Sequence, residues 1–216
     1  LKYLAMLPIL GAVALPQAQP PVAPNIKNLT MWGTGCPIGA AGQVTGTRGE
    51  TPVFSFVEWG LSLPNTDDPE APGTASKFCT EEITLSNGPV GLQLRIESVT
   101  VSGWASLEEG TKLIVEADTR LGDVEAGKQI ATITKADIKD GVFELPLEIL
   151  PTVYSACVEA SGDVPKIVVK TTVSLIGERR ADGSFSGGVV GGDKTDLKKA
   201  LGVHFTPVWR PCARPM

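Results

Sequence analysis

The sequence predicts an all-β protein, namely an antiparallel β-sandwich of jelly-roll type with two disulfides and at most one short helix. Three observations indicate this fold. Apolar and polar residues alternate along many short segments, and a period of two places one face of a strand on a core and the other in water. Turn-forming residues separate these segments, with 24 glycines and 17 prolines among 216 residues. The four cysteines are an even number, as disulfide pairing requires.

The first residues have the pattern of a secretory signal peptide, which we assign to residues 1–18. Lys2 precedes an apolar run over residues 3–15, and small residues follow, so cleavage is expected after Ala14 or Ala18. This run is shorter than the roughly 20 residues that a membrane-spanning helix needs. We therefore expect a secreted, extracellular protein that leaves the membrane when the signal is removed. Residues 19–25 are expected to form a Pro-rich linker, and residues 26–216 a single β-sandwich domain.

Alternation and β-branched residues predict the strands. The clearest segment is residues 92–104, where Leu92, Leu94 and Ile96 alternate with polar residues. Residues 167–173 are dense in β-branched side chains, which favour strands. The expected strands are residues 26–32, 52–59, 92–104, 112–117, 129–134, 141–147, 153–158, 166–176 and 203–209.

Turns, loops and one helix complete the expected fold. Turn dipeptides such as Asp140-Gly141 fall between the strands. Residues 64–76 and 179–192 are rich in polar residues, proline or glycine, and are expected to be exposed loops. A helix is expected only at residues 194–201, where Thr195 could cap its first turn.

The cysteines are Cys36, Cys79, Cys157 and Cys212. Four cysteines allow three disulfide pairings. We favour the sequential one, in which the first cysteine pairs with the second and the third with the fourth. Disulfides are typical of proteins that fold in an oxidising compartment, as the signal peptide implies. A zinc site is not expected, because there is no Cys-x-x-Cys pair and His204 is the only histidine.

Ordered motifs along the chain resemble a known family. They are Gly33-Thr34-Gly35-Cys36-Pro37, Phe54-Ser55-Phe56, Lys77-Phe78-Cys79, the segments 88–94 and 101–110, and Val208-Trp209-Arg210-Pro211-Cys212. In order and spacing they resemble the secreted fungal and bacterial family called domain of unknown function 4360. The resemblance implies a small secreted β-sandwich with paired cysteines, and it implies no reaction. We expect Gly33 and Gly35 to adopt positive φ angles and Pro37 to fix the next bend, so that together they aim Cys36 at its partner; a binding role for this glycine loop is the alternative. Gly103 is expected to allow a bend or bulge beside Trp104.

Catalytic and metal-binding residues are sparse in this sequence. A Ser-His-Asp or Cys-His arrangement would have to use His204, which lies in an expected strand, and no nucleotide-binding or zinc-protease motif is present. Paired carboxylates of the kind that glycosidases use could come from Glu58, Glu97, Glu144 and Glu148. Glu58 beside Trp59 is the most suggestive contact for a glycan. No cofactor is expected.

Three further features bear on ligands and modification. Calcium could bind at Asp67, Asp68 and Glu70, or at Asp193 and Asp196, although solvated loops are the simpler interpretation. The single glycosylation sequon places a glycan at Asn28. We expect the four tryptophans to be core residues rather than a sugar platform; they are Trp32, Trp59, Trp104 and Trp209.

These observations predict a binding or surface-interaction module rather than an enzyme. The expected partner is a cell-wall glycan or an extracellular protein, and the expected oligomeric state is a monomer. The net charge of −5 and the scattered basic residues argue against a nucleic-acid partner. The alternative is a carbohydrate-active enzyme that works with paired glutamates.

Overall fold

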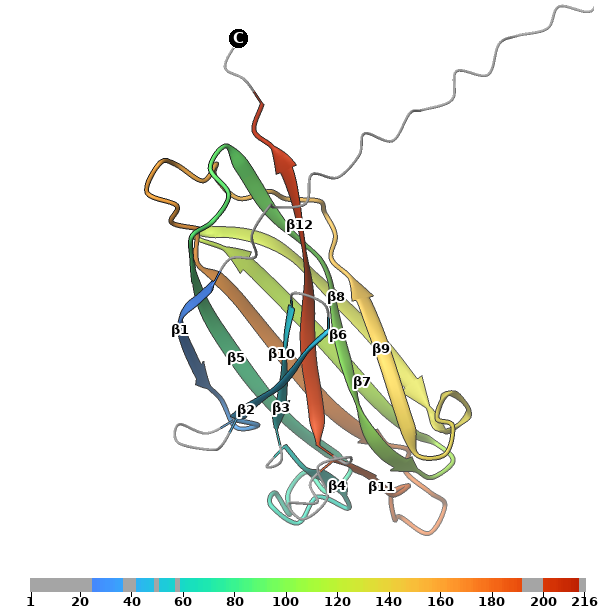
Figure 1. Cartoon of the computed structure of the whole chain (residues 1–216). Coiled ribbons are helices and arrows are strands. Elements are labelled where there is room, and N and C mark those ends of the chain that lie inside the picture. Colours follow the sequence, from blue (N-terminus) through green and yellow to red (C-terminus); the bar gives the residue numbers. More distant parts are fainter. Residues whose placement is uncertain (1–24, 37–41, 49–50, 57–58, 192–199, 214–216) are drawn as a thin grey trace, which may run out of the picture.

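Two antiparallel sheets stack as layers in the computed structural model, which describes residues 25–36, 42–48, 51–56, 59–191 and 200–213 (Figure 1). Within these residues the first sheet has the order β1, β5, β10, β7, β8, with bounds Asn25–Trp32, Thr74–Ser86, Ile167–Gly177, Thr111–Leu121 and Val124–Thr134. The second has the order β2, β3, β12, β6, β11, β4, with bounds Gly42–Arg48, Thr51–Phe56, Leu201–Pro211, Leu92–Leu107, Gly188–Val190 and Leu61–Leu63. The predicted antiparallel β-sandwich is confirmed.

Two smaller elements complete the described fold. Strand β9 (Val142–Glu148) pairs with β6, and a short 3-10 helix η1 (Lys135–Asp137) precedes it. Strands β4 and β11 lie at one end of the molecule, and the loop between β8 and β9 lies at the same end (Figure 1). The predicted helix at residues 194–201 falls mostly outside the described residues, and Leu201 belongs to β12.

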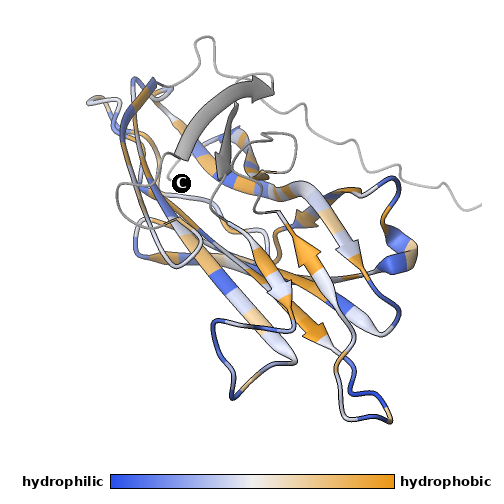
Figure 2. Cartoon of the chain, turned by 90° about the horizontal axis from the view of Figure 1, so that it is seen from below, coloured by the Kyte–Doolittle hydropathy of each residue, from blue (hydrophilic) through white to orange (hydrophobic). Residues whose placement is uncertain are grey.

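The core lies between the sheets because the strands alternate as the sequence predicts. On β6 the side chains of Leu94, Val99 and Val101 are fully buried, while their neighbours on the strand, apart from the buried Thr100, are partly exposed. On β10 Val169 and Leu175 are also fully buried. Each such side chain stabilises the fold by about 1.5–3 kcal/mol relative to an exposed one. Polar residues gather instead in the connecting loops, which appear mostly blue in Figure 2.

Both disulfides of the sequential pairing are present. Cys36–Cys79 and Cys157–Cys212 join residues 43 and 55 positions apart. Cross-links over loops of this size stabilise a fold by about 4 kcal/mol each in the chain-entropy model. Disulfides persist in oxidising compartments, so this chain has the covalent structure of a protein that folds in one.

The Gly-Thr-Gly-Cys motif has a structural role around Cys36. Gly33 has a φ of 147°. A Cβ on Gly33 would collide with the carbonyl oxygen of Phe78. Gly35 donates its N–H to the Phe78 carbonyl at 2.8 Å. A Cβ on Gly35 would lie 2.7 Å from the Trp59 indole, so Gly35 is needed for close packing rather than for a positive φ.

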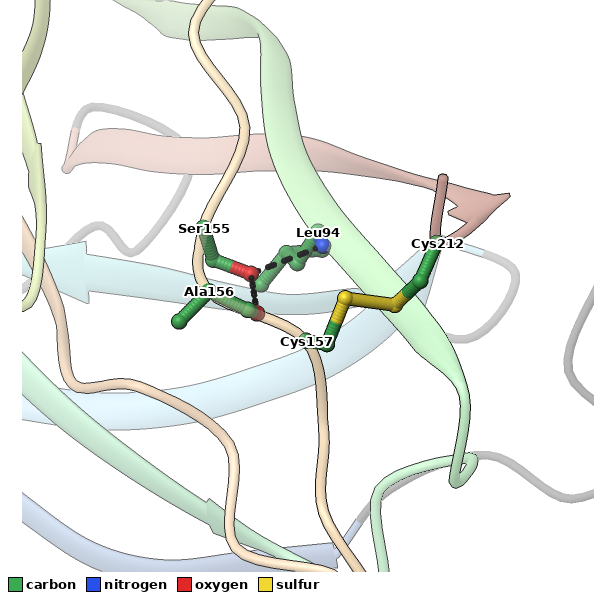
Figure 3. Close-up of a disulfide and its surroundings, with 5 residues drawn as sticks. All are labelled: Leu94, Ser155, Ala156, Cys157 and Cys212. Atoms are coloured by element: carbon green, nitrogen blue, oxygen red, sulfur yellow. Dashed lines mark hydrogen bonds between the residues drawn. A yellow bond between two sulfur atoms is a disulfide. The ribbon is translucent and has the colours of Figure 1, made fainter. Parts of the chain in front are cut away.

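Residues 153–158 were expected to be a strand and instead form an extended strap along β6. The Ser155 N–H donates to the Leu94 carbonyl at 2.7 Å, and the Val158 N–H donates to the Leu92 carbonyl at 2.8 Å. The Ser155 hydroxyl accepts the Leu94 N–H at 2.9 Å and donates to the Ala156 carbonyl at 2.7 Å (Figure 3). A side chain thus takes the place of a ladder carbonyl, and the Cys157–Cys212 disulfide holds the strap to the end of β12.

Other departures from the predicted elements have local causes. The predicted loops 64–76 and 179–192 contain the start of β5 at Thr74 and the whole of β11. Gly103 shows no bulge; a Cβ there would lie 2.9 Å from the Leu201 side chain, so close packing requires the glycine. The bulge in β6 falls between Ile96 and Ser98, opposite Thr206 and Pro207.

Glu81 on β5 is a carboxyl group inside the core. It is 1 % exposed, and its neighbours on the inner face of β5, Cys79 and Ile83, are 0 % exposed. Directly across from it lie Met31 on β1 and Val169 on β10. Neither carboxyl oxygen has a hydrogen-bond partner among the residues that the structure describes. Burial raises the pKa of Glu81 to about 8, so the buried group is mainly protonated at neutral pH.

We predict that Glu81 makes the fold more stable in acid than in alkali. The unfolded chain releases this proton near the ordinary value of 4.5 and the folded chain near 8, so the folded state binds more protons between these values. The free energy of unfolding should therefore fall as the pH rises through this window, by an amount on the order of 5 kcal/mol. Glu81→Gln should remove the fall, as measured by chemical denaturation at a series of pH values.

The neighbouring Glu82 provides the control. It lies on the outer face of β5 and forms an ion pair with the Lys166 Nζ at 2.8 Å. Glu82→Gln should retain the decline between pH 4.5 and 8, because it leaves Glu81 unchanged. An equal decline in wild type and Glu81→Gln would contradict the account of the buried carboxyl group.

Candidate functional site

Trp104 is placed on the outer face of the second sheet by the alternation of β6. Val101, Ala105 and Leu107 on this strand face the core and are buried. Ser106 is exposed, and Trp104 is half-buried. The expectation that all four tryptophans are core residues is therefore wrong for Trp104, because its position in β6 has the opposite parity from the core positions. Trp32 is half-buried as well, and only Trp59 and Trp209 belong to the core.

A groove of about 440 Å³ runs beside Trp104. We call it the Trp104 groove. Its lining residues are Trp104, Ala105, Ser106, Leu107, Lys135, Ile138, Asp140 and Gly141. It combines a large aromatic ring with a carboxylate, an ammonium group and a hydroxyl group. Small-ligand sites commonly combine apolar surface with a few polar groups in this way.

A two-residue turn fixes one wall of the Trp104 groove. Asp140 and Gly141 have φ angles of 55° and 79°, as a tight Asp-Gly hairpin turn requires. The Val142 N–H donates to the Lys139 carbonyl at 3.0 Å, and the Ala105 N–H donates to the Gly141 carbonyl at 2.8 Å. A Cβ on Gly141 would collide with the indole Nε1 of Trp104. The glycine therefore lets the turn pack directly against the tryptophan ring.

The short helix η1 contributes Lys135 to the lining of this groove. The Asp137 carboxylate accepts the Thr134 N–H and the Thr134 hydroxyl, both at 2.8 Å. These two hydrogen bonds hold the pKa of Asp137 below its ordinary value. Asp137 thus remains ionised and fixes the start of η1, from which Lys135 extends.

A second groove, of about 590 Å³, lies at the ends of β7 and β10. We call it the Glu178 groove. Its lining residues are Glu109, Gly110, Thr111, Lys112, Thr134, Lys135, Ala136, Ile176, Gly177 and Glu178. It contains two glutamates that the sequence analysis did not single out, Glu109 and Glu178, and both are exposed.

A third groove, of about 560 Å³, includes Asp67 and Asp68 of the loop considered for calcium. The Asn65 Oδ1 accepts the N–H groups of Asp67 and Asp68 at 3.1 and 3.3 Å, and the Asp68 Oδ1 accepts the Glu70 N–H at 3.2 Å. Among the described residues no three acidic, histidine or cysteine side chains are grouped to hold a metal. The loop is thus organised by its own hydrogen bonds. The other calcium candidates, Asp193 and Asp196, lie outside the described residues.

Of the glycan contact predicted at Glu58 and Trp59, the structure describes only Trp59. Trp59 is 0 % exposed and packs against Gly35, so its ring faces the interior. Glu58 lies outside the described residues. Burial of the ring follows from the Cys36 loop, which approaches it from a distant part of the chain.

The other glutamates proposed as a catalytic pair do not line any of these three grooves. Glu144 and Glu148 are four residues apart on β9, and so roughly 13 Å apart along the strand. Glu97 pairs with Arg95 at 2.6 Å. His204 lies within β12 opposite Thr100, and it lines none of the three grooves either.

Comparison with known proteins identifies a family and gives weak structural likenesses. A model of the family described as "Domain of unknown function (DUF4360)" matches residues 23–212. The resemblance inferred from the motifs is therefore confirmed. No curated protein matches this chain.

Three solved structures are similar at low scores. TmCBM61 in complex with β-1,4-galactotriose is 12 % identical, with a TM-score of 0.26 over 86 % of this chain and 89 % of that one. The family 11 carbohydrate-binding module from Clostridium thermocellum, in complex with a β-1,3-1,4-mixed-linked tetrasaccharide, is 12 % identical, with a TM-score of 0.21 over 77 % and 91 %. The enzymatically active domain of bacteriophage CBA120 tailspike protein 4 is 13 % identical, with a TM-score of 0.23 over 87 % of this chain and 20 % of that one. Scores this low carry no inference about a ligand.

Proposed function

This chain belongs to the DUF4360 family, a domain of unknown function, and from that premise we propose that it is a secreted, non-enzymatic module that binds an extracellular glycan through the Trp104 groove. The observation that carries the proposal is the half-buried indole of Trp104, which lines an open groove together with Asp140, Lys135 and Ser106.

The chemistry of the groove matches that of a sugar ring. The face of an aromatic ring is electron-rich, so it attracts the weakly positive C–H groups on the apolar face of a pyranose. The hydroxyl groups around the rim of a sugar need both donors and acceptors. Lys135 donates, the Asp140 carboxylate accepts, and the Ser106 hydroxyl does either. Because Asp140 and Lys135 are held by a tight turn and a capped helix, little ordering is needed on binding.

An extracellular location supports the same proposal. Both disulfides are of the kind that persists in oxidising compartments. Among the described residues there is no helix long and apolar enough to cross a membrane. The N-terminal signal pattern, residues 1–18, would direct the chain to the cell exterior.

The alternative function is a carbohydrate-active enzyme that uses paired glutamates. Glu109 and Glu178 line the same groove, and this pair is the observation that favours an enzyme. Both are exposed to solvent, whereas the acid of a glycosidase works in an environment that raises its pKa. We therefore favour binding, and the release of reducing ends from a retained polysaccharide would support the enzyme instead.

We predict that Trp104 is required for glycan retention. Trp104→Ala should abolish retention of the full chain on the insoluble polysaccharide that it binds, among cellulose, β-1,3-glucan, mannan and chitin. Trp104→Phe should retain part of the binding because it keeps an aromatic face. The measurement is the fraction of protein depleted from solution by each polysaccharide.

A matched control removes an aromatic ring from the opposite outer face. Phe78 on β5 lies under the Lys170 Nζ at 5.0 Å and lines none of the three grooves. Phe78→Ala should bind as the wild type does. Equal retention of wild type and Trp104→Ala, or no retention on any of the four polysaccharides, would contradict the proposal.

Secretion also makes Asn28 a glycosylation site in our proposal. Asn28 and Thr30 of the sequon are exposed on the edge strand β1, where a glycosyltransferase can reach them. Expression through a eukaryotic secretory pathway should add the mass of one N-linked glycan, measured on the intact protein. Asn28→Gln and Thr30→Ala should each remove this mass, and a wild-type mass without a glycan would contradict the assignment.

A further inference from the structure

Lys135 lines both the Trp104 groove and the Glu178 groove. Because the two grooves share this wall residue, they adjoin at Lys135, and a ligand that follows the surface there can contact both. We propose that the two grooves form one continuous channel that binds the interior of an uncharged polysaccharide chain. This inference rests on the proposed function and extends it from a single sugar ring to a run of several.

The size of the two grooves supports a run of sugars. The Trp104 groove has about 440 Å³ and the Glu178 groove about 590 Å³. Each volume lies in the range that accommodates a complete small ligand. Apolar surface is present in both grooves, since Trp104 lines the first and Ile176, which is 40 % exposed, lines the second. A sugar ring can therefore pack against apolar surface on each side of Lys135.

The far wall of the channel is as well fixed as the wall beside Trp104. Thr111 is 2 % exposed, and its hydroxyl donates to the Gly187 carbonyl at 2.8 Å and lies 2.9 Å from the Ser186 hydroxyl. The Glu178 N–H donates to the Gly110 carbonyl at 3.1 Å. A Cβ on Gly110 would lie 2.9 Å from a Glu178 carboxylate oxygen, so the glycine lets this side chain lie close to the turn.

An ion pair next to this wall holds its loops together. The Glu108 carboxylate accepts the Gly187 N–H and an Arg180 guanidinium N–H, both at 2.6 Å. The backbone hydrogen bond and the arginine lower the pKa of Glu108. The segment that precedes Glu109 is thus attached to the segment that follows Glu178. Fixed walls reduce the ordering that binding would otherwise require.

Charge and exposure indicate which kind of chain fits. The channel carries both signs, with Lys112 and Lys135 among the acidic groups Asp140, Glu109 and Glu178. Mixed charges can hydrogen-bond hydroxyl groups without favouring a polyanion or a polycation. All five side chains are exposed, so the site is a surface channel. A surface channel accepts the middle of a polymer, whereas recognition of a chain end needs a closed pocket.

The test measures affinity against oligosaccharide length with the full chain. The probes are soluble oligosaccharides, from disaccharide to hexasaccharide, of whichever polysaccharide among cellulose, β-1,3-glucan, mannan and chitin retains the protein. Wild-type affinity should increase about tenfold or more over this series, as a second occupied groove would provide. Lys112→Ala and Ile176→Ser alter the Glu178 groove alone, so each should keep disaccharide affinity and lose the increase with length.

Controls separate the channel from the proposed function. Lys170→Ala, an exposed lysine that lines none of the three grooves, should behave as wild type, and unchanged melting temperatures show that the variants fold. Disaccharide binding that depends on Trp104 but does not increase with length would overturn the channel and leave the proposed function intact. Absence of binding to every probe would overturn both.

Discussion

The described structure depends on the pairing of one long strand, β6, with its neighbours. Over Leu92–Leu107 it pairs with β12, β9 and β11 in turn, and the strap at Ser155 bonds to its first residues. Because its side chains alternate, one face of β6 supplies the centre of the core, and the strand pairing fixes which residues lie on the other face. Near the end of β6 this alternation leaves Trp104 facing outward. Strand pairing that builds the core therefore also determines where the aromatic surface of the candidate site lies.

The rest of the site is supplied by turns at the end of the sandwich. Strands end there, and the connections carry the polar residues that a core could not hold without partners. The β8–β9 connection brings Lys135 and Asp140 to the ring of Trp104, and the β10–β11 connection brings Glu178 to Gly110. Each turn is stabilised locally, by the Asp137 cap or by the Asp140-Gly141 hairpin. A rigid sandwich with short, well-bonded turns presents polar groups at fixed positions, as a binding site requires.

Alternation predicted most of the longer strands but missed β2, β4, β5 and β11, and it predicted the surface only in part. Strand β5 escaped prediction because Glu81, a charged residue in the sequence, occupies an inner position that an apolar residue would usually take. The strap at residues 153–158 alternates as a strand does, but Ser155 replaces a ladder hydrogen bond with its hydroxyl. The sequence around Trp59 and Trp104 does not show which ring is buried, because the groups that pack against them, Gly35 and Gly141, come from other segments of the chain. The parity of Trp104 relative to Val101 and Ala105 was a signal for its outward position, whereas nothing local linked it to Lys135.

The most direct test of the account observes the four tryptophan side chains while a glycan binds. In an NMR titration of the full chain with an oligosaccharide of the retained polysaccharide, the indole N–H resonance of Trp104 should shift progressively to saturation. The resonances of Trp59 and Trp209, which are buried in the core, should stay in place. Shifts confined to Trp32, or saturation binding that leaves Trp104 unchanged, would contradict the claim that this groove is the glycan site.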